Sequence, residues 1–207
     1  MTTSSNRRYQ LLGVLGILAL VAASVIYWAT NRTEAYEFNG GEISPAAAAP
    51  ALDLTDQNGE SFSLSQENGN VSLIYFGYTT CPDLCPTTLI DFTTVKDELG
   101  EDGADVDFIM VTFDPERDTE ERMKEYLNFF DPEFIGLRGD DAQTEQFLTN
   151  YGVTVNRVEY PESETGYLLD HTALIYVIDK EGRLRLTYPY GTDPLMIVED
   201  VQHLVKE

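Results

Sequence analysis

Basic residues are scarce in this chain. Its 207 residues include 13 Lys and Arg against 36 Asp and Glu, which gives a net charge of −23. Nucleic-acid binding requires clusters of Lys and Arg that neutralise phosphates, so the composition excludes nucleic acid as a partner. The same charge disfavours a domain that lies flat on anionic lipid. The acidic charge could attract a basic partner or a cation, and the simpler interpretation is a well-solvated surface.

Cysteine and histidine are also rare, with two of each. The cysteines are Cys81 and Cys85, and the histidines are His171 and His203. No internal repeat is recognisable. With 43% hydrophobic residues, a chain of this length suits one well-packed domain with an appendage rather than two full domains.

Charge is absent from the apolar run at residues 9–29, which follows Arg7 and Arg8. As a helix, this run is long enough to span the ~30 Å hydrocarbon core of a bilayer. It ends in Tyr27 and Trp28, which suit a membrane interface, instead of in a small-residue cleavage site. We therefore expect a single-pass, uncleaved anchor: residues 1–32 supply a cytoplasmic N-terminus and the transmembrane helix, and the rest is extracytoplasmic, in the periplasm or on the outer face of the cell membrane.

The chain beyond the anchor divides into a tether and a folded domain. Residues 33–50 lack strong periodicity and contain Pro45 and Pro50 around an alanine run, which is typical of a tether. We expect the folded domain over residues 51–207. It opens with alternating apolar residues around Asn58-Gly59, the signal of a β-hairpin.

Apolar periodicity in this domain predicts an α/β thioredoxin-like fold. The predicted strands are 71–76, 106–113, 172–178 and 184–188, and the predicted helices are 86–99, 118–130, 140–151 and 193–205. A polar loop is expected over residues 156–170. The order of strands and helices implies a mixed central sheet flanked by helices on both faces, with the hairpin at its N-terminal side.

The two cysteines stand in the sequence CPDLCP at residues 81–86, between the first buried strand and its helix. Ligands collect at the carboxyl end of such strands, and the N-terminus of the following helix favours thiolates. If the segment coils, Cys81 and Cys85 are close enough for a disulfide or for one shared ion. Pro82 and Pro86 predict a rigid, non-helical loop at both cysteines. A purely stabilising disulfide is disfavoured, because so short a loop removes little entropy from the unfolded chain.

The third candidate ligand is His171, at the junction between the polar loop and the next strand. With Cys81 and Cys85 it gives a Cys₂His set that is soft enough for Cu(I) and, through the imidazole, able to hold Cu(II). Zinc would require a fourth ligand or water, so the residues alone favour copper only modestly. We interpret His203, in the last helix, as a surface or half-buried residue.

Three motifs follow one another along the chain. They are FGYTTCPDLCPTTL at residues 76–89, DPERDT at 114–119 and DHT at 170–172. In these motifs, and over about residues 40–207, the chain resembles the SCO (SenC) family of copper-delivery factors for cytochrome c oxidase assembly. The resemblance implies a thioredoxin-like fold and one copper per chain, as Cu(I) or Cu(II), held by Cys81, Cys85 and His171.

The resemblance also implies partners. These are the dinuclear copper site of cytochrome c oxidase subunit II, which would receive the metal, an upstream copper donor, and the membrane through the N-terminal helix. Such a metallochaperone binds and transfers its cargo without enzymatic turnover.

Two alternatives stay open. An extracytoplasmic thiol-disulfide oxidoreductase that reduces the cysteines of subunit II would use Cys81 and Cys85 as its redox-active pair and would not need His171. Against it, the spacing is Cys-x₃-Cys, whereas thioredoxins have Cys-x₂-Cys. A peroxidase would need an activating arginine, for which Arg117 is the plausible candidate.

Other polar and aromatic residues near these motifs receive structural interpretations. We predict that Asp118 caps the helix that follows it and that Asp114 forms a hydrogen bond near the site without being a ligand. Asp83 is expected to be solvent-exposed. Tyr75, Phe76 and Tyr78 are interpreted as strand packing, and the loop at 156–170 is predicted to become ordered when metal binds.

Overall fold

The computed structural model describes residues 13, 16–18, 20–27, 36–66, 69–162 and 165–207, and the chain divides into two units at residue 37. Of the predicted membrane span at 9–29, residues 13, 16–18 and 20–27 are helical, and the others lie outside the described residues. Within the described part of the chain, no helix is both long and apolar enough to cross a membrane. The anchor therefore stays a prediction.

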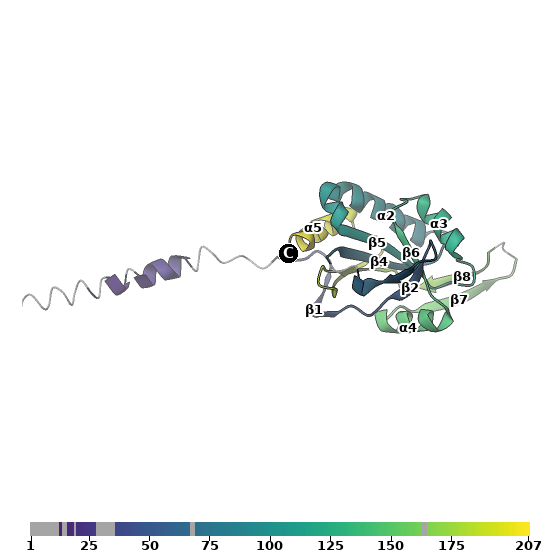
Figure 1. Ribbon diagram of the computed structural model, residues 1–207, viewed down its shortest axis with the longest axis horizontal. Coiled ribbons are helices and arrows are strands. Elements are labelled where there is room, and N and C mark those ends of the chain that lie inside the picture. The colour runs from purple at the N-terminus through teal and green to yellow at the C-terminus, as the bar shows by residue number, and fades with distance from the viewer. Residues whose placement is uncertain (1–12, 14–15, 19, 28–35, 67–68, 163–164) are drawn as a thin grey trace, which may run out of the picture. The chain divides into compact units, whose positions relative to one another are not determined.

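A mixed sheet forms the centre of residues 38–207 (Figure 1). Its strands lie in the order β1-β10-β9-β4-β5-β6-β2-β3. The pairs β4–β5 and β5–β6 are parallel and the other pairs are antiparallel, as predicted for this fold class. The bounds are β1 (Gly41–Ala48), β2 (Asp53–Asp56), β3 (Ser61–Ser63), β4 (Val71–Gly77), β5 (Val106–Thr112), β6 (Ile135–Arg138), β9 (Leu174–Ile178) and β10 (Arg183–Pro189).

Helices cover both faces of this sheet (Figure 1). They are α2 (Leu84–Leu99), α3 (Glu120–Asn128), α4 (Asp141–Tyr151) and α5 (Pro194–Lys206), with short 3₁₀ turns at Leu64–Gln66 and Gly100–Asp105. Phe92 of α2 packs on Phe108 of β5, whereas Phe147 of α4 stacks on Phe76 of β4. Because Phe108 pairs with Leu73 and side chains alternate along a strand, these two contacts lie on opposite faces. The predicted three-layer arrangement is confirmed.

Part of the predicted tether is a strand. Residues 41–48 form β1, which pairs antiparallel with β10 from Gly41–Thr187 to Ala48–Arg183. Most of its residues are exposed, so it has no apolar alternation for a sequence analysis to detect. The segment just before it is also fixed, because the buried carboxylate of Asp200 accepts hydrogen bonds from the backbone N–H groups of Asn39 and Gly40.

The predicted polar loop at 156–170 is a second sheet of two strands. β7 (Val155–Tyr160) and β8 (Gly166–His171) pair antiparallel in a hairpin that extends from one side of the domain (Figure 1). Tyr167 and Leu169, on alternate positions of β8, are its buried residues. The hairpin ends at His171, so its attachment to the domain sets the position of that imidazole. Its ordering by metal stays a prediction.

Candidate metal centre

The cysteine pair lies where β4 gives way to α2. The N–H of Cys81 donates to the carbonyl oxygen of Tyr78 at 3.3 Å, and the N–H of Cys85 points at Cys81 Sγ at 3.5 Å. Cys85 is buried and helical, which corrects the prediction of a non-helical loop there. Pro86 is tolerated because the first turn of a helix has no internal partner for its N–H groups. Cys81 is partly exposed.

His171 brings its ring to the cysteine pair from the end of β8. Its Nε2 lies 3.9 Å from Cys85 Sγ, and its Nδ1 lies 2.9 Å from the carbonyl oxygen of Thr172. A carbonyl oxygen only accepts hydrogen bonds, so this contact assigns the ring proton to Nδ1. Nε2, the other ring nitrogen, faces the sulfur, which is the orientation that a metal ligand needs.

The structure thus brings together the three residues selected from the sequence. The sulfurs of Cys81 and Cys85 and a ring nitrogen of His171 all lie within 4.8 Å of one another. Ligands bound at ~2.3 Å (sulfur) and ~2.1 Å (nitrogen) from one ion stand about 4 Å apart, so this spacing fits a single metal with little adjustment. The three side chains can form a copper site. His203 lies elsewhere, where it pairs with Glu207 at 3.2 Å and packs on Phe38.

The two thiols differ in their protonation. Burial, followed by the hydrogen bond and charge of Cys81, raises the pKa of Cys85. The hydrogen bond from Cys85 lowers the pKa of Cys81, against the effect of burial. Cys81 is therefore the thiol of the metal-free pair that ionises first, whereas Cys85 retains its proton. A thiophilic cation replaces this proton when it binds both sulfurs.

Aromatic side chains surround the imidazole. The ring centroid of Phe113 lies 4.9 Å from that of His171, and those of Tyr75 and Tyr78 lie 6.1 and 6.2 Å away. The hydroxyl of Tyr75 lies 3.6 Å from Cys85 Sγ. The interpretation of Tyr75 and Tyr78 as strand packing was therefore incomplete. Tyr75 shares the strand face of Gly77, beneath the start of α2, and that alternation is the signal that could have placed it at the site.

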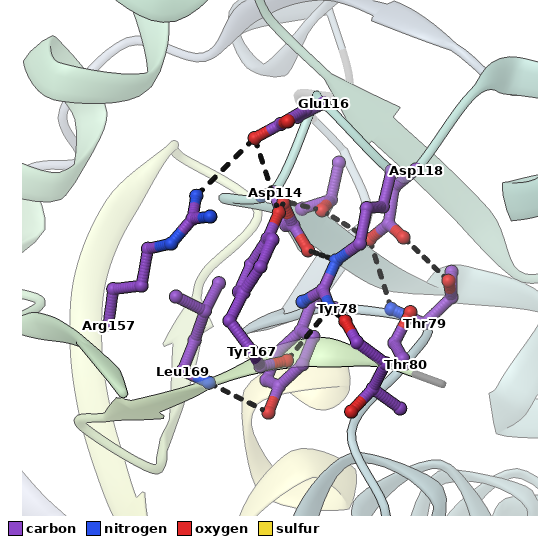
Figure 2. Close-up of polar contacts among 12 residues, drawn as sticks. Tyr78, Thr79, Thr80, Asp114, Glu116, Asp118, Arg157, Tyr167 and Leu169 are labelled. Carbon is purple, nitrogen blue, oxygen red and sulfur yellow. Dashed lines mark hydrogen bonds and ion pairs between the residues drawn. The ribbon is translucent and has the colours of Figure 1, made fainter. Parts of the chain in front are cut away.

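Asp118 holds the loop that leads to Cys81, which corrects its prediction as a helix cap. The cap of α3 is Thr119, whose hydroxyl accepts from the N–H of Arg122. Asp118 is fully buried and accepts from the N–H of Thr79 at 3.0 Å and from the hydroxyls of Thr79 and Thr112 at 2.5 and 2.6 Å (Figure 2). Burial raises its pKa.

The remaining motif residues lie around the site. Asp83 is exposed, as predicted. Asp114 accepts from Arg117 Nε at 2.6 Å and from the hydroxyl of Tyr167 at 2.7 Å, so it binds the hairpin that carries His171. Arg117 is committed to this cluster and, within the described residues, has no hydrogen bond to either cysteine, which removes the activating group that the peroxidase alternative needs.

Together, the fold and the site define a thioredoxin-like domain with a Cys₂His candidate metal centre at the start of its first long helix. The family model SCO1/SenC matches residues 41–206, and the chain belongs to this family.

Relatives and solved structures agree with this assignment. An SCO2-like protein of Rickettsia felis is 40% identical over 148 residues, which are 72% of each chain. A putative copper-binding protein of Stutzerimonas stutzeri is 34% identical over 139 residues, or 67% of each chain. The structure of Bradyrhizobium japonicum ScoI with copper bound is 39% identical, with a TM-score of 0.69 over 76% of this chain and 99% of that one.

Proposed function

We propose that this protein is a membrane-anchored, extracytoplasmic copper chaperone that delivers one copper ion to the dinuclear copper site of cytochrome c oxidase subunit II. The observation that carries the proposal is the convergence of Cys81 Sγ, Cys85 Sγ and a His171 ring nitrogen within 4.8 Å. Membership of the SCO1/SenC family supports the oxidase as the destination, and the uncharged run at residues 9–29 supports the anchor.

The donor set favours copper over zinc. Two thiolates and one imidazole satisfy Cu(I) in a three-coordinate site, whereas structural zinc sites almost always have four protein ligands. Among the described residues, the group that could hold an ion contains no carboxylate or second histidine. The copper-bound ScoI of B. japonicum supports the same choice.

Unequal burial of the ligands suits transfer. Cys85 is 0% exposed and anchors the ion inside the domain, whereas Cys81 is partly exposed and is already the thiolate of the pair. A thiolate of the acceptor protein can therefore approach from the side of Cys81 and replace Cys81 as a copper ligand. His171 and Cys85 would then dissociate from the copper in later steps. The release of metal then needs no unfolding of the core.

The same asymmetry favours a second function, the reduction of a partner's disulfide. A low-pKa, accessible Cys81 would attack a disulfide sulfur, and the neighbouring Cys85 thiol would then attack the mixed disulfide. The products are a Cys81–Cys85 disulfide and two thiols on the partner, so the electrons balance. Disulfide exchange does not require His171, whereas the copper site does, and this difference separates the two functions experimentally.

The test is copper binding by the reduced full-length chain in detergent, compared among wild type, His171→Ala and the matched control His203→Ala. Three results together support delivery. The wild type binds one copper per chain, His171→Ala alone loses the sulfur-to-Cu(II) charge-transfer band, and the loaded wild type transfers its copper to a metal-free subunit II domain. Absence of copper binding by the wild type refutes it. Retained disulfide reduction in His171→Ala would then leave the oxidoreductase as the function.

A further inference from the structure

The hairpin β7–β8 carries His171 but lies outside the central sheet, so something must hold it to the domain. Its buried side chains are Tyr167 and Leu169, which are 7% and 8% exposed. They precede His171 by four and two residues on the same strand. Whatever fixes these two positions also fixes the direction from which the imidazole approaches the cysteines.

The ring of Tyr167 lies between two guanidinium groups. The Cζ atoms of Arg117 and Arg157 each lie 3.5 Å from its centroid. Two guanidinium groups at this distance cannot share one face of a ring, so they stack on opposite faces. Arg117 belongs to the segment between β5 and α3, whereas Arg157 belongs to β7 and reaches Glu116 at 3.4 Å (Figure 2). The ring therefore joins the hairpin to the body of the domain.

Hydrogen bonds close this cluster. The hydroxyl of Tyr167 donates to Asp114 Oδ1 at 2.7 Å, and Arg117 Nε donates to Asp114 Oδ2 at 2.6 Å. Arg117 Nη1 also donates to the carbonyl oxygens of Thr165 and Tyr167, both at 2.9 Å. Burial and the hydrogen bond to Asp114 raise the pKa of Tyr167, so its hydroxyl keeps its proton and stays a donor. Charge-assisted contacts in so buried a cluster are strong and directional.

A second connection joins the hairpin to the segment that carries the cysteines. The N–H of Leu169 donates to the hydroxyl of Tyr78 at 3.1 Å (Figure 2). The ring centroid of Tyr78 lies 6.2 Å from that of His171. Tyr78 is 1% exposed and lies three residues before Cys81. This hydrogen bond therefore holds β8, which carries His171, against the loop that carries Cys81. It does so at Leu169, two residues before His171.

We propose that Tyr167 is a positioning residue for the metal centre: clamped between Arg117 and Arg157 and bonded to Asp114, it fixes the hairpin so that His171 Nε2 faces Cys85 Sγ. The inference rests on the proposed copper site. It gives a function to Arg157, an exposed cation in an acidic domain, and it explains why Asp114 turns toward the hairpin. Among the described residues, the hydrogen bonds and ring contacts of Tyr167 are with Asp114, Glu116, Arg117 and Arg157 rather than with the three metal ligands.

A double-mutant cycle in the full-length chain tests the positioning. We expect Tyr167→Leu to lower Cu(I) affinity about tenfold when His171 is present, the size of effect seen for residues that orient a metal ligand, and to have no effect in the His171→Ala background. Tyr167→Phe keeps the stacked ring and its packing volume, and it should show a smaller loss of Cu(I) affinity with the same dependence on His171. Equal losses in both backgrounds, or no loss in either, overturn the proposal.

Tyr151→Phe is the matched control. Tyr151 is also buried, and its hydroxyl donates one hydrogen bond, to the carbonyl oxygen of Pro50 at 2.8 Å. The Tyr151→Phe variant should be less stable than wild type and should bind copper with unchanged affinity. A drop in affinity as large as that of Tyr167→Phe would show that any lost tyrosine hydrogen bond weakens the site, and would overturn the proposal.

Hydrogen exchange of the copper-free chain separates a failure of this inference from a failure of the proposed function. If wild type binds no copper, the proposed function fails, but the amide of Leu169 still reports on the clamp. We expect this amide to exchange at least tenfold faster in Tyr167→Leu than in wild type or Tyr151→Phe. Unchanged exchange shows that the hairpin is held without Tyr167 and refutes the clamp.

Discussion

The hydroxyl of Tyr75 lies 3.6 Å from the sulfur of Cys85 and points a donor at the buried thiol of the candidate copper centre. The two residues come from β4 and from the first turn of the helix above it. Burial and the nearby Cys85 raise the pKa of Tyr75, so the phenol stays protonated throughout the pH range of the folded protein. A bound metal would therefore be held by two unlike thiolates. The Cys85 thiolate accepts a hydrogen bond from Tyr75, whereas the Cys81 thiolate is partly exposed to solvent.

Replacing Tyr75 by Phe should change the electronic character of the copper site more than its stability. Without the hydrogen bond, the Cys85 thiolate donates more strongly, which stabilises Cu(II) over Cu(I). We expect the sulfur-to-Cu(II) charge-transfer band to move to longer wavelength and the copper reduction potential to fall. Absorption and a redox titration measure both, with Tyr151→Phe as control. An unmoved band and potential would mean that the phenol does not interact with the ligand.

Cys81 should be a thiolate at acid pH as long as Cys85 is present. The hydrogen bond from Cys85 lowers the pKa of Cys81, so its alkylation rate should stay nearly flat over roughly pH 5 to pH 8, where an ordinary thiol gains about tenfold per pH unit. In Cys85→Ala the donor is gone, and the rate should rise with pH. Iodoacetamide labelling read by mass spectrometry checks this. A wild-type rate that climbs across the whole range would contradict it.

Most of the fold follows from local signals. β4 is an apolar run interrupted by Ser72 and is buried at all seven positions. α4 carries a capping box between Asp140 and Gln143 and ends at Gly152 in the left-handed conformation. The three metal ligands could also be predicted from the sequence, because a chain with two cysteines and two histidines offers few possible sets of sulfur and imidazole ligands.

What the sequence did not reveal depends on backbone pairing and on distant partners. β1 is held by its hydrogen bonds to β10, and its residues, most of them small and exposed, carry no apolar pattern. The β7–β8 hairpin is fixed by cations and carboxylates around Tyr167, which resemble loop residues in a linear sequence. Asp118 precedes a helix as a cap would, and only its burial beside Thr79 and Thr112 distinguishes it.

Gly77 should be intolerant of any side chain. A Cβ at this position would lie 2.8 Å from Cε1 of Tyr75 and 3.0 Å from Cys85 Sγ, closer than atoms can pack without a shift. Gly77→Ala should therefore lower the free energy of unfolding by about 1–3 kcal/mol, as overpacking does, and weaken copper binding by displacing the sulfur. Urea unfolding of the copper-free protein and a copper competition assay measure the two effects. Gly103→Ala, whose Cβ would meet the Lys96 carbonyl oxygen at 3.3 Å, serves as a milder comparison and should leave copper affinity unchanged.

Asp118 should make the free energy of unfolding depend on pH. Its neighbour Thr119, whose hydroxyl caps α3 and does not titrate, should not. Burial raises the pKa of Asp118 in the folded state, so the folded protein holds this proton more tightly than the unfolded chain does. Its contribution to stability is therefore greatest below the ordinary aspartate pKa of about 4 and is lost as the pH rises through the folded-state value.

Asp118→Asn removes this titration and replaces one acceptor oxygen with a donor group that faces the hydroxyls of Thr79 and Thr112. We expect wild type to gain stability relative to Asp118→Asn as the pH falls from about 7 to about 4. Thr119→Ala removes the actual cap of α3 and should cost ~1 kcal/mol equally at both pH values. Urea unfolding of the three proteins at both pH values decides the matter. A difference between wild type and Asp118→Asn that stays constant, or that grows as the pH rises, would show that Asp118 binds its proton no more tightly in the folded state and would leave its role to hydrogen bonding alone.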